Sequence, residues 1–363
     1  MRRLTLRQST LLLWVYIAAA VAFFFTLGIA ILDEELPYQF YADSVTYEKM
    51  AAGEFDAQLE GESLVSVGAN YLGPVLLLRA VNGSRVAILV LNILVFVVGF
   101  KLLARFVPLD RRLLFLVLGL NPMTFASLLS INKEIIAYAT VCLLVGFMGT
   151  RRLRWLLPAL VLSIFSRWQL TAFVIAVALA FSFLNPLRRY PLATLALATL
   201  ALTVIYPQLG GVLDLVSENA ASGAPIGNQS GIYQQMVAIQ DSYGYILVVI
   251  PKTLQAMFGI IGRLSNFGDP DDFYNMVFVA LHSVALAAVF IALLVTGRFR
   301  LRDPLVFGSL LFCVLFSLSP VYAPRYYYPV YVLWACALSR RLPKAELSAR
   351  ARPVSAPSST VTQ

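Results

Sequence analysis

The sequence predicts an all-α polytopic membrane protein with about ten transmembrane helices. Of its 363 residues, 60% are hydrophobic and only 13% are charged, which is about half the charged fraction of a typical soluble domain. Mean hydropathy is +0.79, and the apolar residues gather in repeated long runs that are typical of membrane spans. This composition excludes a cytosolic enzyme, a secreted disulfide scaffold and a disordered protein.

The first candidate span, residues 11–32, follows Arg2, Arg3 and Arg7 and is long enough to cross a bilayer as a helix. No small-residue cleavage site stands out after it, so we expect an uncleaved signal-anchor. Nine further apolar runs are expected to form spans: 86–104, 113–131, 135–149, 155–165, 168–184, 191–206, 274–296, 304–318 and 326–338.

Two divisions between these spans rest on polar interruptions. The segment Asn132-Lys133-Glu134 separates runs 113–131 and 135–149, which together are too long for one span. Arg167 separates runs 155–165 and 168–184, and basic residues flank this pair at both ends, which favours a hairpin with both ends in the cytoplasm. Because run 155–165 is short, we expect Arg167 to lie below the outer surface in a polar cavity.

The charges give the topology. With a cytoplasmic N-terminus, most of the 28 basic residues fall in loops on the cytoplasmic side, where only Asp110, Asp303 and Glu346 are acidic. This is the positive-inside pattern, so the net charge of +9 is a topology signal and nucleic acid is not an expected partner. We expect a multi-pass protein of the bacterial inner membrane with both termini in the cytoplasm.

Residues 1–339 are expected to form a single transmembrane domain, with a first extracytoplasmic loop at 33–85 and a second large extracytoplasmic region at 207–273. Within the second region, the apolar segment 245–261 is interrupted by Pro251-Lys252. We interpret it as a re-entrant or interfacial helix, because a full crossing would place the next basic loop outside. Residues 340–363 form a basic tail that is expected to be disordered and cytoplasmic.

The first outer loop contains a candidate catalytic carboxylate. Asp43, Tyr47 and Met50-Ala51 have the spacing of one helix face, so a carboxylate lies just outside the first span and could act as a general base on a hydroxyl group. The alternative is an interfacial helix with Asp43 or Ser44 as its N-cap. Glu134 and Glu48 are the other candidate bases.

Four basic residues lie on the outer side near span ends: Lys133, Arg167, Arg263 and Arg325. A cation at membrane depth costs at least roughly 2.5–3.5 kcal/mol, so it needs a wet cavity or an anion. With Gln169 and Tyr326 beside them in the sequence, these cations would suit a phosphate or diphosphate. The alternatives are snorkelling beside aromatic belts and, for Lys133, a local ion pair with Glu134.

Other features are weaker. Asp269-Pro270-Asp271-Asp272 could bind a divalent cation but also suits a solvated turn, and His282 suits a packed, hydrogen-bonded residue. Cys142, Cys313 and Cys336 are expected to be inert packing residues. No phosphate-binding loop or dinucleotide fingerprint is present, and we expect neither a metal nor a cofactor.

The chain resembles polytopic membrane glycosyltransferases of the GT-C superfamily and related bacterial surface-polysaccharide polymerases. The resemblance lies in Asp43-Ser44-x-x-Tyr47-x-x-x-Ala51 and in the late segment Pro324-Arg325-Tyr-Tyr-Tyr-Pro329. It implies that Asp43 assists catalysis and that Arg167 and Arg325 hold the phosphate of a polyprenyl-linked sugar. The acidic pair often found in that loop is not clear here, and no large soluble domain follows the spans.

Two function classes therefore remain. The first is a glycosyltransferase with a lipid-linked sugar donor, a glycan or lipid acceptor and polysaccharide-assembly partners, transferring either one sugar or whole repeat units. The second is a transporter or flippase of a lipid-linked or anionic solute. A transporter predicts inverted repeats, broken helices at the midplane and charge inside several spans.

Overall fold

The computed structural model describes residues 2–31, 43–53, 68–182, 189–209, 231–259, 278–319 and 324–341. Over these ranges the chain is helical, and its only β-type pairing is an isolated bridge between Leu109 and Arg340. The predicted all-α fold class is confirmed. The expected tail, which begins at residue 340, falls almost wholly outside the described residues.

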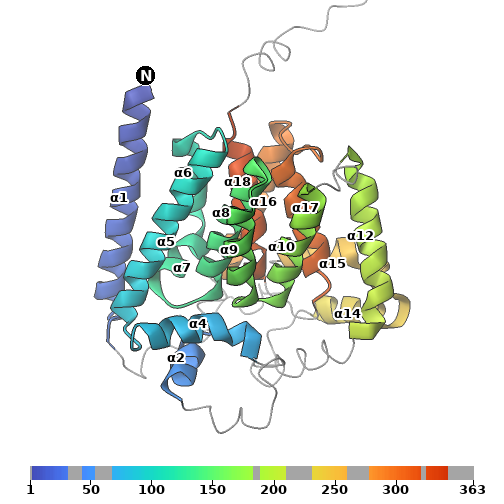
Figure 1. Ribbon diagram of the computed structural model, residues 1–363, viewed down its shortest axis with the longest axis horizontal. Coiled ribbons are helices and arrows are strands. Elements are labelled where there is room, and N and C mark those ends of the chain that lie inside the picture. Colours follow the sequence, from blue (N-terminus) through green and yellow to red (C-terminus); the bar gives the residue numbers. More distant parts are fainter. Residues whose placement is uncertain are drawn as a thin grey trace, which may run out of the picture.

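The described α-helices range from the 25 residues of the first to the 8 residues of Pro122–Leu129 (Figure 1). The α-helices are α1 (Arg2–Thr26), α2 (Ser44–Ala52), α4 (Gly68–Ala80), α5 (Arg85–Phe106), α6 (Arg111–Leu120), α7 (Pro122–Leu129), α8 (Lys133–Thr150), α9 (Leu153–Ile164), α10 (Trp168–Phe181), α12 (Pro191–Ile205), α14 (Gly231–Tyr243), α15 (Val249–Phe258), α16 (Ala280–Val295), α17 (Pro304–Phe316) and α18 (Tyr328–Ser339). Among the described residues, the 3₁₀ helices are η2 (Tyr206–Leu209), η4 (Tyr245–Leu247) and η8 (Pro324–Tyr327).

Several helices have the length and apolar character of membrane spans. Among the described residues, four helices qualify, and a fifth span is counted if the bent pair α6–α7 is one crossing. Helices α9, α10, α16 and α17 are apolar but shorter, so the number of ten crossings stays a prediction. Helix α15 has ten residues, about 15 Å of helix, and is too short to cross a bilayer alone.

The run 113–131, predicted as one span, is divided into two helices, and whether the pair makes one crossing stays a prediction. Helices α6 and α7 meet at Asn121-Pro122 with a bend of 75°. Proline has no backbone N–H and disfavours helical geometry at the preceding residue. Asn121 is accordingly extended, and its side-chain oxygen accepts a hydrogen bond from Met123 N at 2.9 Å. Because the whole run is apolar, its composition did not reveal that one helix ends before Asn121 and that Asn121 caps the start of the next.

The two interruptions that the sequence predicted are confirmed. Helix α8 begins at Lys133, because Asn132 is extended and its Oδ1 accepts a hydrogen bond from Ile135 N at 2.9 Å. Helix α9 ends at Ile164 and α10 begins at Trp168, with Arg167 in extended geometry between them. Both Lys133 and Arg167 therefore lie at helix starts.

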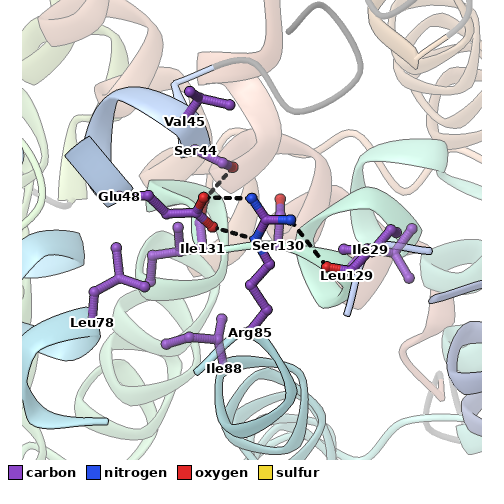
Figure 2. Close-up of a pocket in the computed structure, with 10 residues that line it drawn as sticks. All are labelled: Ile29, Ser44, Val45, Glu48, Leu78, Arg85, Ile88, Leu129, Ser130 and Ile131. Carbon is purple, nitrogen blue, oxygen red and sulfur yellow. Dashed lines mark hydrogen bonds and ion pairs between the residues drawn. The ribbon is translucent and has the colours of Figure 1, made fainter. Parts of the chain in front are cut away.

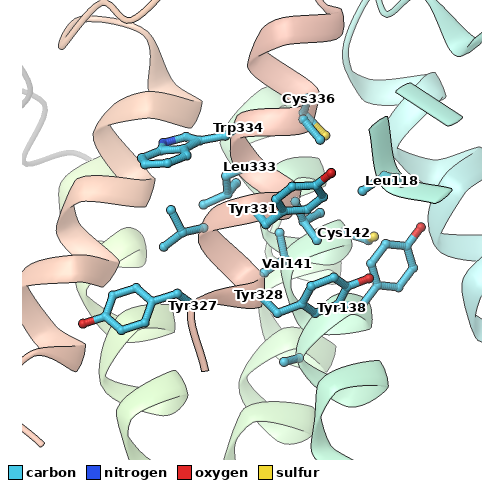
Figure 3. Close-up of a cluster of buried hydrophobic side chains, with 14 of the residues drawn as sticks. Leu118, Tyr138, Val141, Cys142, Tyr327, Tyr328, Tyr331, Leu333, Trp334 and Cys336 are labelled. Carbon is cyan, nitrogen blue, oxygen red and sulfur yellow. The ribbon is translucent and has the colours of Figure 1, made fainter. Parts of the chain in front are cut away.

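Helix α18 occupies the middle of the bundle and is buried almost all round, which is typical of a helix that lacks a polar face (Figure 3). Tyr328 and Tyr331 point towards Tyr138 of α8, whereas Trp334 points to the other side. The Trp334 Nε1 atom donates to Ser309 Oγ at 2.7 Å, so its polar group is satisfied. The three cysteines are buried and free, as expected of packing residues.

The two ends of the bundle are chemically different. At one end the loops flanking α5, α16 and α18 meet: Asp110 N donates to Ser339 O at 2.8 Å, and Arg340 pairs with Asp303 at 2.7 Å. Helices α2 and α4 lie at the end opposite the N-terminus (Figure 1). The loops assigned to the cytoplasm thus include several that gather at one end, and the side of the membrane on which this end lies stays a prediction.

Candidate functional site

Helix α2 places Asp43 over the end of the bundle. Ser44 Oγ donates to Ile131 O at 2.8 Å, and the buried Tyr47 ring packs beneath the helix. Tyr47 OH donates to Asp43 Oδ2 at 3.4 Å, so these two residues share one helix face as the spacing predicted. The same face packs on an apolar cluster of Tyr47, Met50, Ala51, Val75, Leu78, Ile88 and Ile131.

Asp43 occupies the N-cap position of this helix, as the alternative interpretation allowed, and its backbone oxygen accepts from Tyr47 N at 3.0 Å. Its side chain, however, accepts no hydrogen bond from the first turn, and Ser44 Oγ donates to another element. The Asp43 carboxylate is therefore not used as a cap. The Asp43 carboxylate instead pairs with Arg325, with 2.7 Å between Oδ2 and Nη2, and its side chain remains 40% exposed.

A second carboxylate joins the two arginines. Glu134 Oε1 accepts a hydrogen bond from Arg167 Nη2 at 2.9 Å and lies 4.0 Å from Arg325 Nε. The side chains of Glu134 and Arg167 are only 6% and 7% exposed. The expected local pair between Lys133 and Glu134 is wrong, because the Glu134 carboxylate turns to α10 and not to its sequence neighbour.

Tyr326 lies against both arginines. Its ring centroid is 3.7 Å from Arg167 Cζ and 5.4 Å from Arg325 Cζ, within the range of cation–π attraction. The sequence places Arg167 and Arg325 near the ends of different predicted spans. In the structure both contact Tyr326 and the Glu134 carboxylate.

Lys133 is held differently from the arginines. Lys133 is 7% exposed, and its Nζ lies 4.5 Å from the centroid of the Tyr71 ring and 5.6 Å from the centroid of the Tyr47 ring. Among the described residues, no hydrogen bond or ion pair reaches Lys133 Nζ. In the described part of the site, the basic side chains of Lys133, Arg167 and Arg325 lie close to the carboxylates of Asp43 and Glu134.

The electrostatics keep Asp43 ionised. Partial burial alone would raise the pKa of the Asp43 carboxyl, but the charges of Arg325, Lys133 and Arg167 outweigh it and hold that pKa below its ordinary value. Burial, together with the charges of Asp43 and Glu134, raises the pKa of Tyr47 well above its ordinary value. At neutral pH the site therefore has a carboxylate at Asp43 and a neutral phenol that donates to it.

Arg85 and Glu48 hold α2 against its neighbours (Figure 2). Two hydrogen bonds of 2.8 and 2.7 Å join their side chains, and Arg85 Nη1 also donates to Ile29 O at 3.2 Å. The cavity beside this pair has a volume of about 20 Å³, room for roughly one water molecule. It cannot accept a sugar, and Glu48 is committed to Arg85.

The sequence did not predict helix α4, which supplies Tyr71. Gly73 N donates to Phe165 O at 3.0 Å, and a Cβ at Gly73 would lie 2.1 Å from that oxygen. Only glycine permits this approach, which docks α4 on the turn before Arg167. The apolar run after Pro74 is a local sequence signal that could have predicted this helix. No local sequence signal could have predicted the contact between Tyr71 and Lys133.

The remaining predicted residues lie apart. Gln169 is buried near the start of α10, but no hydrogen bond between described residues joins it to the charged site, so its role stays a prediction. His282 is fully buried with its Nδ1 atom 2.9 Å from the Asn121 amide, a packed residue as expected. Arg263 and Asp269-Pro270-Asp271-Asp272 lie outside the described residues.

Comparisons of this chain with protein families, with curated proteins and with solved structures find no match.

Proposed function

We propose that the protein is a membrane glycosyltransferase that uses a polyprenyl-phosphate- or diphosphate-linked sugar donor on the extracytoplasmic face. It would act in the assembly of bacterial cell-surface polysaccharide or glycolipid, transferring single sugars or polymerising repeat units. The observation that carries the proposal is the convergence of Lys133, Arg167 and Arg325 beside the half-exposed carboxylate of Asp43.

The convergence of three basic side chains supports an anionic ligand. Burying an unpaired charge is expensive, and a buried cation is normally compensated by an anion or a polar cavity. Lys133 is in contact with two aromatic rings, yet no carboxylate within the described ranges pairs with it. A phosphate group bound between Lys133, Arg167 and Arg325 would supply negative charge and accept charge-assisted hydrogen bonds from these side chains.

The exposure of the two carboxylates supports different roles for them. Asp43 is ionised and 40% exposed, so it can contact an acceptor hydroxyl and act as general base. Glu134 is 6% exposed and occupied by Arg167. We therefore assign Glu134 as a positioning residue that holds the two guanidinium groups. This assignment replaces the hypothesis, made from the sequence, that Glu134 is a candidate general base.

The distribution of charge supports the placement in the membrane. The loops of the basic end would face the cytoplasm by the positive-inside rule, which puts α2 and the charged site outside. Ser222→Cys is expected to react with impermeant thiol reagents only from outside, and Ser355→Cys only from inside. Labelling of Ser222→Cys exclusively from inside would reverse the orientation and remove the extracytoplasmic site.

One observation favours the alternative class, a transporter or flippase of a lipid-linked or anionic solute. The bend of 75° at Asn121-Pro122 follows ten residues of α6, about 15 Å along a bilayer core of roughly 30 Å. Broken helices near the midplane are typical of transporters. However, the described charged residues of the site belong to the segments that begin α2, α8 and α10 and to η8, and none of them lies on α6 or α7.

Purified protein distinguishes the two classes. In detergent, without a membrane or gradient, a glycosyltransferase joins a radiolabelled sugar from a polyprenyl-linked donor to a glycan or lipid acceptor. A flippase moves the intact lipid-linked sugar across proteoliposomes and forms no new glycosidic bond. Movement without transfer over a panel of donors and acceptors would reject the glycosyltransferase.

A further inference from the structure

We infer that the hairpin formed by α14, η4 and α15 is a pH-sensitive latch, docked on the end of α17 while the buried amine of Lys252 is neutral and released when that amine takes up a proton. The hairpin, residues 231–258, contains none of the described residues to which sugar transfer is assigned. The latch is therefore independent of the proposed function.

The hairpin docks on the segment that follows α17 through polar and apolar contacts. Tyr233 OH of α14 donates to Ser319 O at 2.9 Å, and Gln240 Nε2 donates to Leu318 O at 3.2 Å. Both carbonyls lie just beyond the last helical residue of α17, where backbone oxygens need partners from outside the helix. Beside them lies a small buried apolar cluster of Tyr245, Val248, Val249 and Leu318.

Lys252 of α15 is fully buried within this docked hairpin. Its Nζ donates to Gln240 Oε1 at 2.6 Å and lies 5.1 Å from the centroid of the Tyr233 ring. Among the described residues, no carboxylate lies within ion-pair distance of this nitrogen. A neutral amine can give one hydrogen to the amide oxygen of Gln240, whereas an ammonium group would bring three donors and an uncompensated charge to the same place.

The elements packed against α15 do not supply the anion that an ammonium group would need. Asp241 of α14 attracts the charged form of Lys252, but it is exposed and its carboxylate accepts a hydrogen bond from Tyr206 OH. The described parts of η4, α16, α17 and η8 contain no carboxylate, and their ionisable side chains are Tyr245, His282, Cys313, Arg325, Tyr326 and Tyr327. Protonated Lys252 is therefore poorly compensated in the docked hairpin.

The protonation of Lys252 sets the direction of the pH dependence. Burial lowers the pKa of Lys252 to about 7 in the docked hairpin, and the charge of Asp241 offsets only part of this effect. In water the amine has its ordinary pKa of 10.5. Between these two values undocking takes up a proton, so docking weakens about tenfold for each unit by which the pH falls. Below about pH 7 the docked amine is protonated as well, and docking no longer depends on pH.

A chain of hydroxyl groups joins the latch to η8. Thr253 Oγ1 of α15 lies 2.5 Å from Ser317 Oγ, and Ser317 Oγ lies 2.9 Å from Tyr327 OH. The same short helix carries Arg325 and Tyr326. Release of α15 removes Thr253 from this chain, so the hairpin and the charged site are connected through η8.

Amide hydrogen exchange of the purified full-length protein in detergent measures the docking. The protection factors of α14 and α15, which correct for the intrinsic pH dependence of exchange, are expected to rise about tenfold per unit between about pH 7.5 and 9. Lys252→Met retains an unbranched apolar chain without an ionisable group, so its protection factors should not change with pH. Lys133→Met is the matched control, since it removes a buried lysine outside the hairpin, and it should retain the pH dependence of α14 and α15.

Gln240→Glu tests the same cause while the amine is still present. Its carboxylate would pair with Lys252 and raise the pKa of the docked amine towards its ordinary value, so the pH dependence should disappear. The lost hydrogen bond to Leu318 O lowers protection at every pH without restoring the dependence. Protection factors of the unsubstituted protein that stay constant over this range, or a pH dependence that persists in Lys252→Met or in Gln240→Glu, overturn the latch and leave the glycosyltransferase proposal standing.

Discussion

The two ends of the helical bundle use charge in different ways. At the basic end, Arg340 pairs with Asp303 while its side chain is 41% exposed, and Arg298 donates to the backbone oxygens of Leu338 and Arg340. At the other end, Arg167 and Glu134 form their pair almost out of contact with solvent. Both are Arg–carboxylate contacts of similar length, and only their burial differs.

This difference in burial separates a topology signal from a binding site. An exposed ion pair contributes about 0.2–1 kcal/mol to stability, so the ion pairs at the basic end stabilise the fold only slightly. A buried pair carries a desolvation cost that its attraction barely offsets. A buried group of several charged side chains is costly for folding alone, and this cost is the reason for seeking a ligand there.

The largest difference between the ends is expected for catalysis. Asp43→Asn removes the charge and basicity of the candidate base while keeping its shape, so sugar transfer should fall by at least about 100-fold, with insertion retained. Transfer from a lipid-linked donor by purified protein is the measurement. Asp110→Asn, at the basic end, should transfer at the normal rate. Near-normal transfer by Asp43→Asn would leave this carboxylate with only its contact to Arg325.

The second comparison concerns stability. Arg167→Ala leaves Glu134 buried without its guanidinium partner, so unfolding should become easier by about 3–5 kcal/mol. Arg340→Ala removes a half-exposed pair and should cost at most about 1 kcal/mol. Unfolding of both variants in the same detergent tests this. Equal losses would mean that the charged site is more hydrated than its burial indicates.

The docking of α4 should be sensitive to a single methyl group. Gly73→Ala places a Cβ 2.1 Å from Phe165 O, which forces α4 away and should destabilise the protein by about 1–3 kcal/mol. Gly308→Ala, where the nearest atom lies at 3.7 Å, should be neutral or slightly stabilising, since alanine favours a helix. Thermal unfolding gives the stability, and a parallel loss of donor binding by Gly73→Ala would link Tyr71 to the site.

The smallest effect is expected for the pair of Arg85 and Glu48, which is intermediate in burial. A double-mutant cycle with Arg85→Gln and Glu48→Gln should give a coupling energy of about 1–2 kcal/mol, between the values for the two ends. Transfer activity should fall less than in Asp43→Asn, because this pair holds α2 but touches no substrate. A coupling energy near zero would remove it as an anchor of α2.

The sequence was sufficient for features that depend on neighbouring residues. Long apolar runs predicted helices, and Asn132 and Arg167 marked two of the helix boundaries because polar residues there cap or interrupt a helix. The face shared by Asp43 and Tyr47 followed from helical spacing. Asn121-Pro122 is also a local signal of a helix break. We nevertheless predicted a single span there, because the apolar run on both sides of the proline is long.

The tertiary structure alone decided which charges meet. Asp43 and Arg325 are separated by 282 positions, and no local rule states that Glu134 faces Arg167 and not Lys133. Helical periodicity is set by backbone geometry over a few residues, so it fixes the face on which a side chain lies. The partner across that face depends on how distant helices pack, including the approach that Gly73 allows and the tyrosine that α4 brings to Lys133.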